Sequence, residues 1–184
     1  MAINLEKGQR VAVELPQFTI GLGWDVNSSS TGSDFDLDAS AFILGETGKI
    51  MEDEYFVFYN NLSSPDGAVV HTGDNLTGEG DGDDESIMVD LSKIDSRATE
   101  IRFVVTIHKA EERKQNFGQV RNAFIRIYNA STGEEILRYD LDEDFSVETA
   151  VEFGRLYKRN GQWKFEAIGT GQKSGLGEYL NKYN

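Results

Sequence analysis

Val151-Glu-Phe-Gly-Arg-Leu-Tyr157 and Trp163-Lys-Phe-Glu-Ala-Ile168 flank the dipeptide Asn160-Gly161, and this stretch indicates how the chain folds. Both runs are short and rich in β-branched or aromatic residues, a composition that favours strands. A type I′ turn requires positive φ at both central positions, and Asn-Gly readily adopts that conformation. The stretch therefore predicts a β-hairpin.

Similar runs precede this hairpin, each bounded by Gly, Asn, Asp or Ser: 11–15, 18–24, 37–44, 56–59, 86–91, 101–107, 123–128 and 135–139. Helical patterns are confined to 110–115 and to the amphipathic stretch 176–183. About ten short strands separated by turns are typical of a β-sandwich or a β-barrel. We therefore expect an all-β protein with one or two short helices.

The length of 184 residues favours a single domain with a core that needs no disulfides. The chain has no cysteine, which excludes a disulfide framework, a thiolate metal site and a cysteine nucleophile. Residues 1–15 lack the apolar segment of a signal peptide. No stretch approaches the roughly 20 apolar residues that span a bilayer. We expect a soluble, cytoplasmic protein.

Negative charge dominates the chain, with 32 acidic against 18 basic residues and a net charge of -14. Residues 1–90 hold 18 acids and three bases, whereas residues 91–184 hold 14 acids and 15 bases. Binding to a phosphate backbone depends on Lys and Arg, so we expect no nucleic-acid partner. Crowded acids raise the free-energy cost of folding unless a counter-charge neutralises them.

The densest acidic segment is Gly73-Asp-Asn-Leu-Thr-Gly-Glu-Gly-Asp-Gly-Asp-Asp-Glu85. Its glycines let the backbone curl and present carbonyl oxygens beside the carboxylates. Calcium takes about six to eight oxygen ligands, whereas magnesium keeps most of its waters. Zinc is disfavoured because there is no cysteine and the only histidines are His71 and His108. A solvated acidic surface is the alternative, but the interleaved glycines favour calcium.

A second acidic run is Asp34-Phe-Asp-Leu-Asp38. Residues two apart in a strand share a face, so Asp34, Asp36 and Asp38 would line up. Like charges on one face oppose each other unless a cation lies among them. Asp25 and Asn60 follow predicted strand ends, and the loops of a sandwich gather at its two ends. These segments would then converge on the 73–85 loop.

Longer motifs extend over nearly the whole chain: Gly21-Leu-Gly-Trp-Asp25, Asp34-Phe-Asp-Leu-Asp-Ala-Ser40, Phe56-Val-Phe-Tyr-Asn-Asn61, Asp66-Gly-Ala-Val-Val-His-Thr-Gly-Asp-Asn75, Gly78-Glu-Gly-Asp-Gly-Asp-Asp-Glu85, Asn116-Phe-Gly-Gln-Val120 and Ala123-Phe-Ile-Arg126. Together they resemble the TerD family of tellurium-resistance proteins. The resemblance implies that residues 1–184 form one two-sheet β-sandwich domain with two neighbouring calcium sites. It also implies a bacterial cytoplasmic role in resistance to tellurite and other chemical stress.

Carried over position by position, the resemblance also implies a set of metal ligands. They are Asp25, Asp36, Asp38, Asn60, Asp74, Asn75, Asp83, Asp84 and Glu85, with backbone carbonyls near Gly78 and Gly80. Alternate residues of a strand point to opposite sides, so the assignment within Asp83-Asp84-Glu85 can shift by one residue.

We expect the protein to act as a calcium-dependent binding or signalling module rather than as an enzyme. Its expected partners are other stress-resistance proteins, and calcium would also bridge it to anionic lipid at the inner membrane face. One alternative is a metal-assisted hydrolase, in which carboxylates around two metals activate water. The other is a protein that binds a small ligand or a cyclic nucleotide through Arg102, Arg121 and Arg126.

Overall fold

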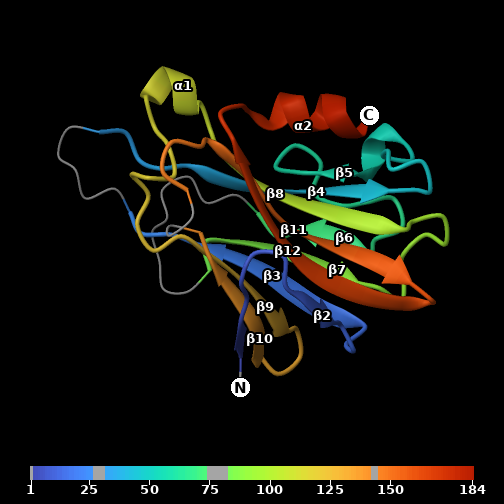
Figure 1. Ribbon diagram of the computed structural model, residues 1–184. Helices are drawn as coiled ribbons and strands as arrows, with labels where there is room; N and C mark the ends of the chain where they lie inside the picture. Colours follow the sequence, from blue (N-terminus) through green and yellow to red (C-terminus); the bar gives the residue numbers. More distant parts are fainter. Residues whose placement is uncertain (1, 27–31, 74–82, 142–144) are drawn as a thin grey trace.

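Two sheets face each other across a shared apolar core (Figure 1). The structure is a computed structural model, and it describes residues 2–26, 32–73, 83–141 and 145–184. Within these residues each sheet has six strands, accompanied by the helices α1 (Ala110–Arg113) and α2 (Leu176–Tyr183) and the 3-10 turn η1 (Asp53–Tyr55). The predicted two-sheet β-sandwich with short helices is confirmed.

The order of the strands differs from their order in the chain. The first sheet contains β1 (Ile3–Asn4), β10 (Glu135–Asp140), β9 (Phe124–Asn129), β3 (Gln17–Gly23), β7 (Glu85–Asp90) and β6 (Val69–His71). The second contains β2 (Arg10–Ala12), β12 (Gln162–Gln172), β11 (Ala150–Arg159), β8 (Glu100–Ile107), β4 (Leu37–Leu44) and β5 (Phe56–Val57). The pairing of β1 with β10 is parallel, whereas β3 pairs antiparallel with both β7 and β9.

The hairpin that the sequence predicts joins β11 to β12. The two strands pair antiparallel as far as Arg159 and Gln162. The turn residues Asn160 and Gly161 have φ of 52° and 75°, the positive values that a type I′ turn requires. The hairpin thus forms the middle of the second sheet, between β8 and β2.

The core lies between the inner faces of the two sheets. Phe18, Ile20 and Leu22 of β3 are buried there, as the alternation of a strand requires. From the second sheet, Phe103 and Phe153 stack with ring centroids 6.0 Å apart. Side chains from both sheets therefore fill one continuous core, which fixes the ends of the strands relative to one another.

Helix α2 covers the outer face of the second sheet (Figure 1). Tyr179 and Tyr183 of this helix pack with apolar residues of the sheet, and the Tyr183 ring lies 5.2 Å from that of Phe42. Beneath the helix, the carboxylate of Glu152 is 2% exposed. It accepts hydrogen bonds from the Tyr183 hydroxyl at 2.6 Å and from Arg102 Nη1 at 2.9 Å. The helix therefore covers a second apolar cluster, and the charge of Glu152 beneath it is balanced by Arg102.

A row of ion pairs continues across the same outer face. Arg102 and Arg155 both contact Glu100, which lies between them. Arg155 also pairs with Glu166 at 2.7 Å, and Glu166 pairs with Arg10 on the edge strand β2 at 3.3 Å. Opposite charges thus alternate from β8 through β11 and β12 to β2. These ion pairs therefore link neighbouring strands of the second sheet.

Candidate functional site

Several of the predicted metal ligands lie at one end of the sandwich, where β3 ends and where β4 and β7 begin. Asp36 and Asp38 are 5% and 4% exposed, and Glu85 is 2% exposed. Asp34, which the alternation placed on the same face, is exposed. Acidic side chains are almost never buried to this extent without a compensating partner. The burial therefore marks this end of the molecule as a functional candidate.

Glu85 connects the two sheets. The backbone N–H of Ala39 on β4 donates to Glu85 Oε2 at 2.9 Å, and His71 Nε2 lies 3.3 Å from the same oxygen. His71 Nδ1 accepts a hydrogen bond from the Gly73 backbone N–H at 3.1 Å. A nitrogen that accepts a hydrogen bond carries no proton, so this contact fits a neutral imidazole beside the Glu85 carboxylate. The spacing of residues along the chain does not reveal this contact.

Asp38 lies next to a second histidine. His108 Nδ1 is 3.8 Å from Asp38 Oδ2, and the His108 backbone N–H donates to the Asp36 carbonyl at 2.8 Å. The ring of Tyr59 packs edge-on against His108 with centroids 6.2 Å apart. Asn60 follows Tyr59 in an exposed turn. The turn after β5 therefore reaches the same end of the sandwich as Asp36 and Asp38.

Asp84 is held at the end of β3. Its Oδ2 accepts from the Trp24 backbone N–H at 2.9 Å, and its own N–H donates to the Leu22 carbonyl at 2.8 Å. Burial raises the pKa of Asp84, and the neighbouring charges of Asp83 and Asp25 raise it further. A carboxylate in such a position favours either a proton or a cation.

Asp25 itself is exposed. Its side chain accepts a hydrogen bond from Asn122 Nδ2 at 2.6 Å, and its backbone N–H donates to the Arg121 carbonyl at 2.9 Å. It lies near enough to Asp84 to raise the pKa of that carboxyl. Asp25 therefore belongs to the acidic end of the sandwich, at its rim.

Asp83 forms a separate contact with a basic side chain. Its two carboxylate oxygens accept from Arg126 Nε at 2.7 Å and from Arg126 Nη2 at 2.9 Å. Gly21 leaves room for this pair, because a Cβ at that position would lie 2.3 Å from Asp83 Cγ. Asp83 thus turns toward Arg126, whereas Glu85 turns toward β4. Alternation would place residues two apart on the same side, and Asp83 departs from it because β7 begins only at Glu85.

The structure brings Asp36, Asp38, Asp84 and Glu85 to the same end of the sandwich. In the part of the chain that is described, no three His, Asp or Glu side chains form a group that could hold a metal ion. The predicted ligands Asp74, Asn75, Gly78 and Gly80 lie outside the described residues. The donors of the described residues are carboxylate oxygens, which fit a hard cation such as calcium.

The arginines considered for a small ligand have other contacts. Arg102 pairs with Glu100 and Glu152, and Arg126 pairs with Asp83 and Glu135. Over the described ranges, no helix has the length and apolar character needed to cross a membrane.

Comparisons with known proteins agree with this architecture. The family model described as "TerD domain" matches residues 1–183. The chain is 52% identical to "General stress protein 16U" of Bacillus subtilis, with 100% of this chain and 97% of that protein covered. It is also 52% identical to "Tellurium resistance protein TerD" of Serratia marcescens, with the same coverage of each chain.

A solved structure shares the fold. The crystal structure of a homologue of telluride resistance protein (TerD) from Streptomyces coelicolor superposes with a TM-score of 0.76 at 20% identity, covering 90% of this chain and 95% of that chain. The resemblance drawn from the sequence motifs is therefore confirmed, and this chain belongs to the TerD domain family.

Proposed function

We propose that this protein is a calcium-binding module of tellurium resistance and the stress response, and that it acts by binding rather than by catalysis. The names of its relatives support the physiological role. The observation that carries the calcium proposal is the burial of Asp36, Asp38 and Glu85 at one end of the sandwich. This end adjoins the most acidic segment of the sequence.

The proposed sites combine described and undescribed residues. Asp36, Asp38, Asp84 and Glu85 would supply rigid oxygens from the strands, and Asp25 and Asn60 would supply oxygens from the rim. Asp74, Asn75 and the carbonyls near Gly78 and Gly80 would complete two neighbouring sites. Asp83 contributes by its pairing with Arg126, which fixes the start of β7 against β3 and β9. Bound calcium would supply the positive charge that the acidic half of the chain lacks.

Binding would change the surface that partners meet. The acidic half repels other acidic surfaces, and that repulsion falls when divalent cations neutralise part of it. The proposed partners are other stress-resistance proteins, with calcium-bridged anionic lipid at the cytoplasmic membrane face as a further contact. The pairing of Arg102 and Arg126 with carboxylates speaks against the small-ligand alternative that used them.

Thermal melting of the purified full chain tests the proposal, first in excess chelator and then in millimolar calcium or magnesium. A ligand specific for the folded state stabilises it by about 2.7 kcal/mol at a hundred times its dissociation constant. Each kcal/mol shifts the midpoint by roughly 2–4 °C in a domain of this size. We expect calcium to raise the midpoint by about 5–11 °C and magnesium to have little effect.

Two variants assign the effect to the site. Asp38→Asn should remove most of the calcium response, because Asp38 is a buried acid of the cluster. Glu46→Gln is the matched control, because Glu46 is exposed beyond the opposite end of β4. Equal midpoints in chelator, calcium and magnesium would contradict the calcium proposal, and turnover of a simple phosphoester in calcium would favour the hydrolase instead.

A further inference from the structure

The ion pair between Arg126 and Asp83 joins β9 to the start of β7 across the strand that lies between them. Gly21 of β3 is in register with Ser86 of β7 on one side and with Arg126 of β9 on the other. The Asp83 carboxylate lies over Gly21, where a Cβ would meet it at 2.3 Å. Its two oxygens accept from Nε and Nη2 of Arg126, and its side chain is 7% exposed. Such a bidentate contact fixes orientation as well as distance.

Arg126 is itself held from two sides. Its Cζ lies 4.7 Å from the centroid of the Tyr128 ring, and Nη1 lies 3.4 Å from Glu135 Oε2. An ammonium cannot reproduce a guanidinium that stacks on a ring and forms a planar fork. β9 therefore presents Arg126 to Asp83 as a fixed anchor, and not as a mobile surface charge.

The two residues that follow Asp83 carry carboxylates that the calcium proposal uses. Asp84 Oδ2 accepts from the Trp24 backbone N–H, directly after β3, at 2.9 Å. Glu85 Oε2 accepts from the Ala39 backbone N–H of β4 at 2.9 Å. Three consecutive acidic residues are thus fastened to three different strands. Because they are consecutive, a displacement of Asp83 would also displace the two carboxylates that follow it.

The charge of Arg126 and its position would act on calcium in opposite directions. A cation near the acidic end repels a second cation, so loss of the charge alone would strengthen calcium binding. Loss of the anchor would weaken binding, because the carboxylates would then have to be ordered when calcium binds. Burial and two nearby carboxylates raise the pKa of Asp84, and Arg126 is not among the described groups that shift it. The anchor should therefore outweigh the charge.

We propose that Arg126 is a positioning residue for the calcium site, a role that rests on the proposed calcium-binding function. Arg126 holds Asp83, and through it the two carboxylates that follow, in the arrangement that the cation needs. Less conformational entropy is then lost when calcium binds. Asp83 acts through Arg126 and is not a ligand itself, which differs from the ligand set that the sequence resemblance implies.

Calorimetric titration of the purified full chain with calcium tests this role, with the affinity and the number of ions bound as readouts. Arg126→Met and Arg126→Lys should each weaken calcium binding at least about tenfold, with the number of ions unchanged. A lysine keeps the charge and loses the fork, so a role of the charge alone predicts wild-type affinity in Arg126→Lys. That result, or unchanged or tighter binding in Arg126→Met, would overturn the proposal.

Asp83→Asn distinguishes positioning from ligation. If Asp83 acts only through Arg126, this variant should match Arg126→Met in calcium affinity and keep the number of ions. The double variant should then be no more than about threefold weaker than either single variant. Losses that multiply to about a hundredfold would show that the two residues act independently, and would overturn the proposal.

Arg138→Met is the matched control. Arg138 of β10 is in register with Arg126 and shares its face of the first sheet. It also stacks on a ring, with Cζ 4.0 Å from the Phe124 centroid, and it pairs with Asp140 at 2.8 Å. None of its described contacts is with residues 83–85. Its calcium affinity should stay within about twofold of the wild type, and a loss as large as that of Arg126→Met would overturn the proposal.

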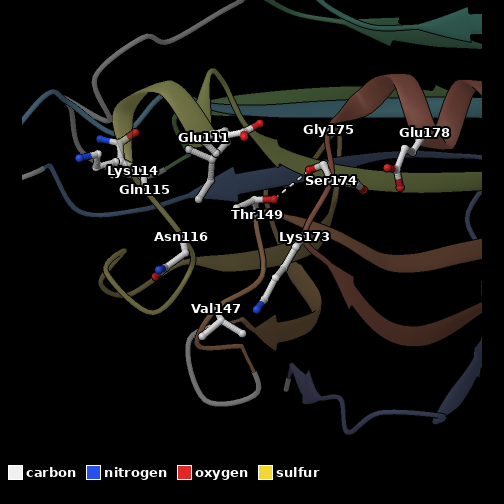
Figure 2. Close-up of a pocket in the computed structure, with 12 residues that line it drawn as sticks. Glu111, Lys114, Gln115, Asn116, Val147, Thr149, Lys173, Ser174, Gly175 and Glu178 are labelled. Atoms are coloured by element: carbon white, nitrogen blue, oxygen red, sulfur yellow. Dashed lines mark hydrogen bonds between the residues drawn. The ribbon is translucent and has the colours of Figure 1, made fainter.

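Lys173→Met controls for the loss of a positive charge elsewhere. Lys173 is exposed on the wall of an open cavity of about 680 Å³ between α1 and α2, and Figure 2 shows its ammonium directed away from the start of α2. Neither Asp83 nor Arg126 lines this cavity. A calcium affinity that falls as far as in Arg126→Met would contradict the proposal.

Failure of the calcium proposal and failure of the positioning role give different results. A wild-type chain that binds no calcium at millimolar concentration would overturn both. A wild-type chain that binds calcium with the same affinity as Arg126→Met would overturn only the role of Arg126. Urea unfolding in chelator shows whether each variant is folded before titration, and Arg126→Lys and Asp83→Asn carry the test if Arg126→Met does not fold.

Discussion

The hydroxyl of Tyr183 offers a direct test of how α2 is held. Tyr183→Phe keeps the ring against Phe42 and removes only the donor to Glu152, at 2.6 Å. Hydrogen bonds to charged groups contribute roughly 1.5–3 kcal/mol, and Glu152 is buried, so we expect a loss in this range. At roughly 2–4 °C per kcal/mol, the midpoint should fall by about 3–12 °C.

Urea unfolding in chelator measures this loss as a shift of the transition midpoint at unchanged slope. Tyr157→Phe is the matched control, because Tyr157 lies on β11 of the second sheet and its hydroxyl makes no hydrogen bond to the described residues. Its free energy of unfolding should change by less than about 0.5 kcal/mol. A change as small in Tyr183→Phe would refute the reasoning, since Arg102 and Lys182 would then suffice to hold Glu152.

Three further predictions concern pH, a glycine and the acidic end. Burial raises the pKa of Tyr183, so above pH ~10 the folded state keeps a proton that the unfolded state releases. The free energy of unfolding should therefore fall as the pH rises above ~10. In urea titrations, Tyr183→Phe should make this fall shallower by up to ~1.4 kcal/mol per pH unit. Gly21→Ala places a Cβ 2.3 Å from Asp83 Cγ and should lower the free energy of unfolding by about 1–3 kcal/mol. Gly177→Ala, in open space on α2, should raise it by about 0.5–1 kcal/mol. Equal effects of the two variants in urea unfolding would contradict this prediction. The raised pKa of Asp84 means that its ionised form opposes folding as pH rises through the folded pKa, so Asp84→Asn should raise the melting midpoint in chelator and reduce the added rise in calcium; a lower midpoint in chelator would count against it.

Much of the fold follows from local patterns. The predicted range 37–44 is the observed range of β4, and 176–183 is that of α2. The pattern missed β1 and β6, which have two and three residues, because such short runs show no periodicity. β5 ends at Val57, earlier than the predicted Tyr59, because the chain turns there and Phe58 pairs with Asn61.

The candidate site was predictable only in part. The sequence identified Asp36, Asp38 and Glu85, whose burial the structure shows, and calcium at this cluster stays a prediction. The contact of His71 with Glu85 depends on how β6 lies beside β7, and no local pattern specifies that. The contact of Arg126 with Asp83 likewise depends on β9 and β7 flanking β3. These are non-local pairings, which is why residue spacing did not reveal them.

The ion pairs on the outer face of the second sheet also bear on how the strands find their alignment during folding. Alternating apolar residues penalise a slip by one position, because it turns the core face outward. They do not penalise a slip by two, which keeps each side chain on its own face. In the native alignment Arg155 is opposite Glu166. A slip by two would place Arg155 opposite Lys164 or Ile168 and would break its ion pair with Glu166. The ion pairs therefore disfavour a slip by two positions, which the apolar alternation tolerates.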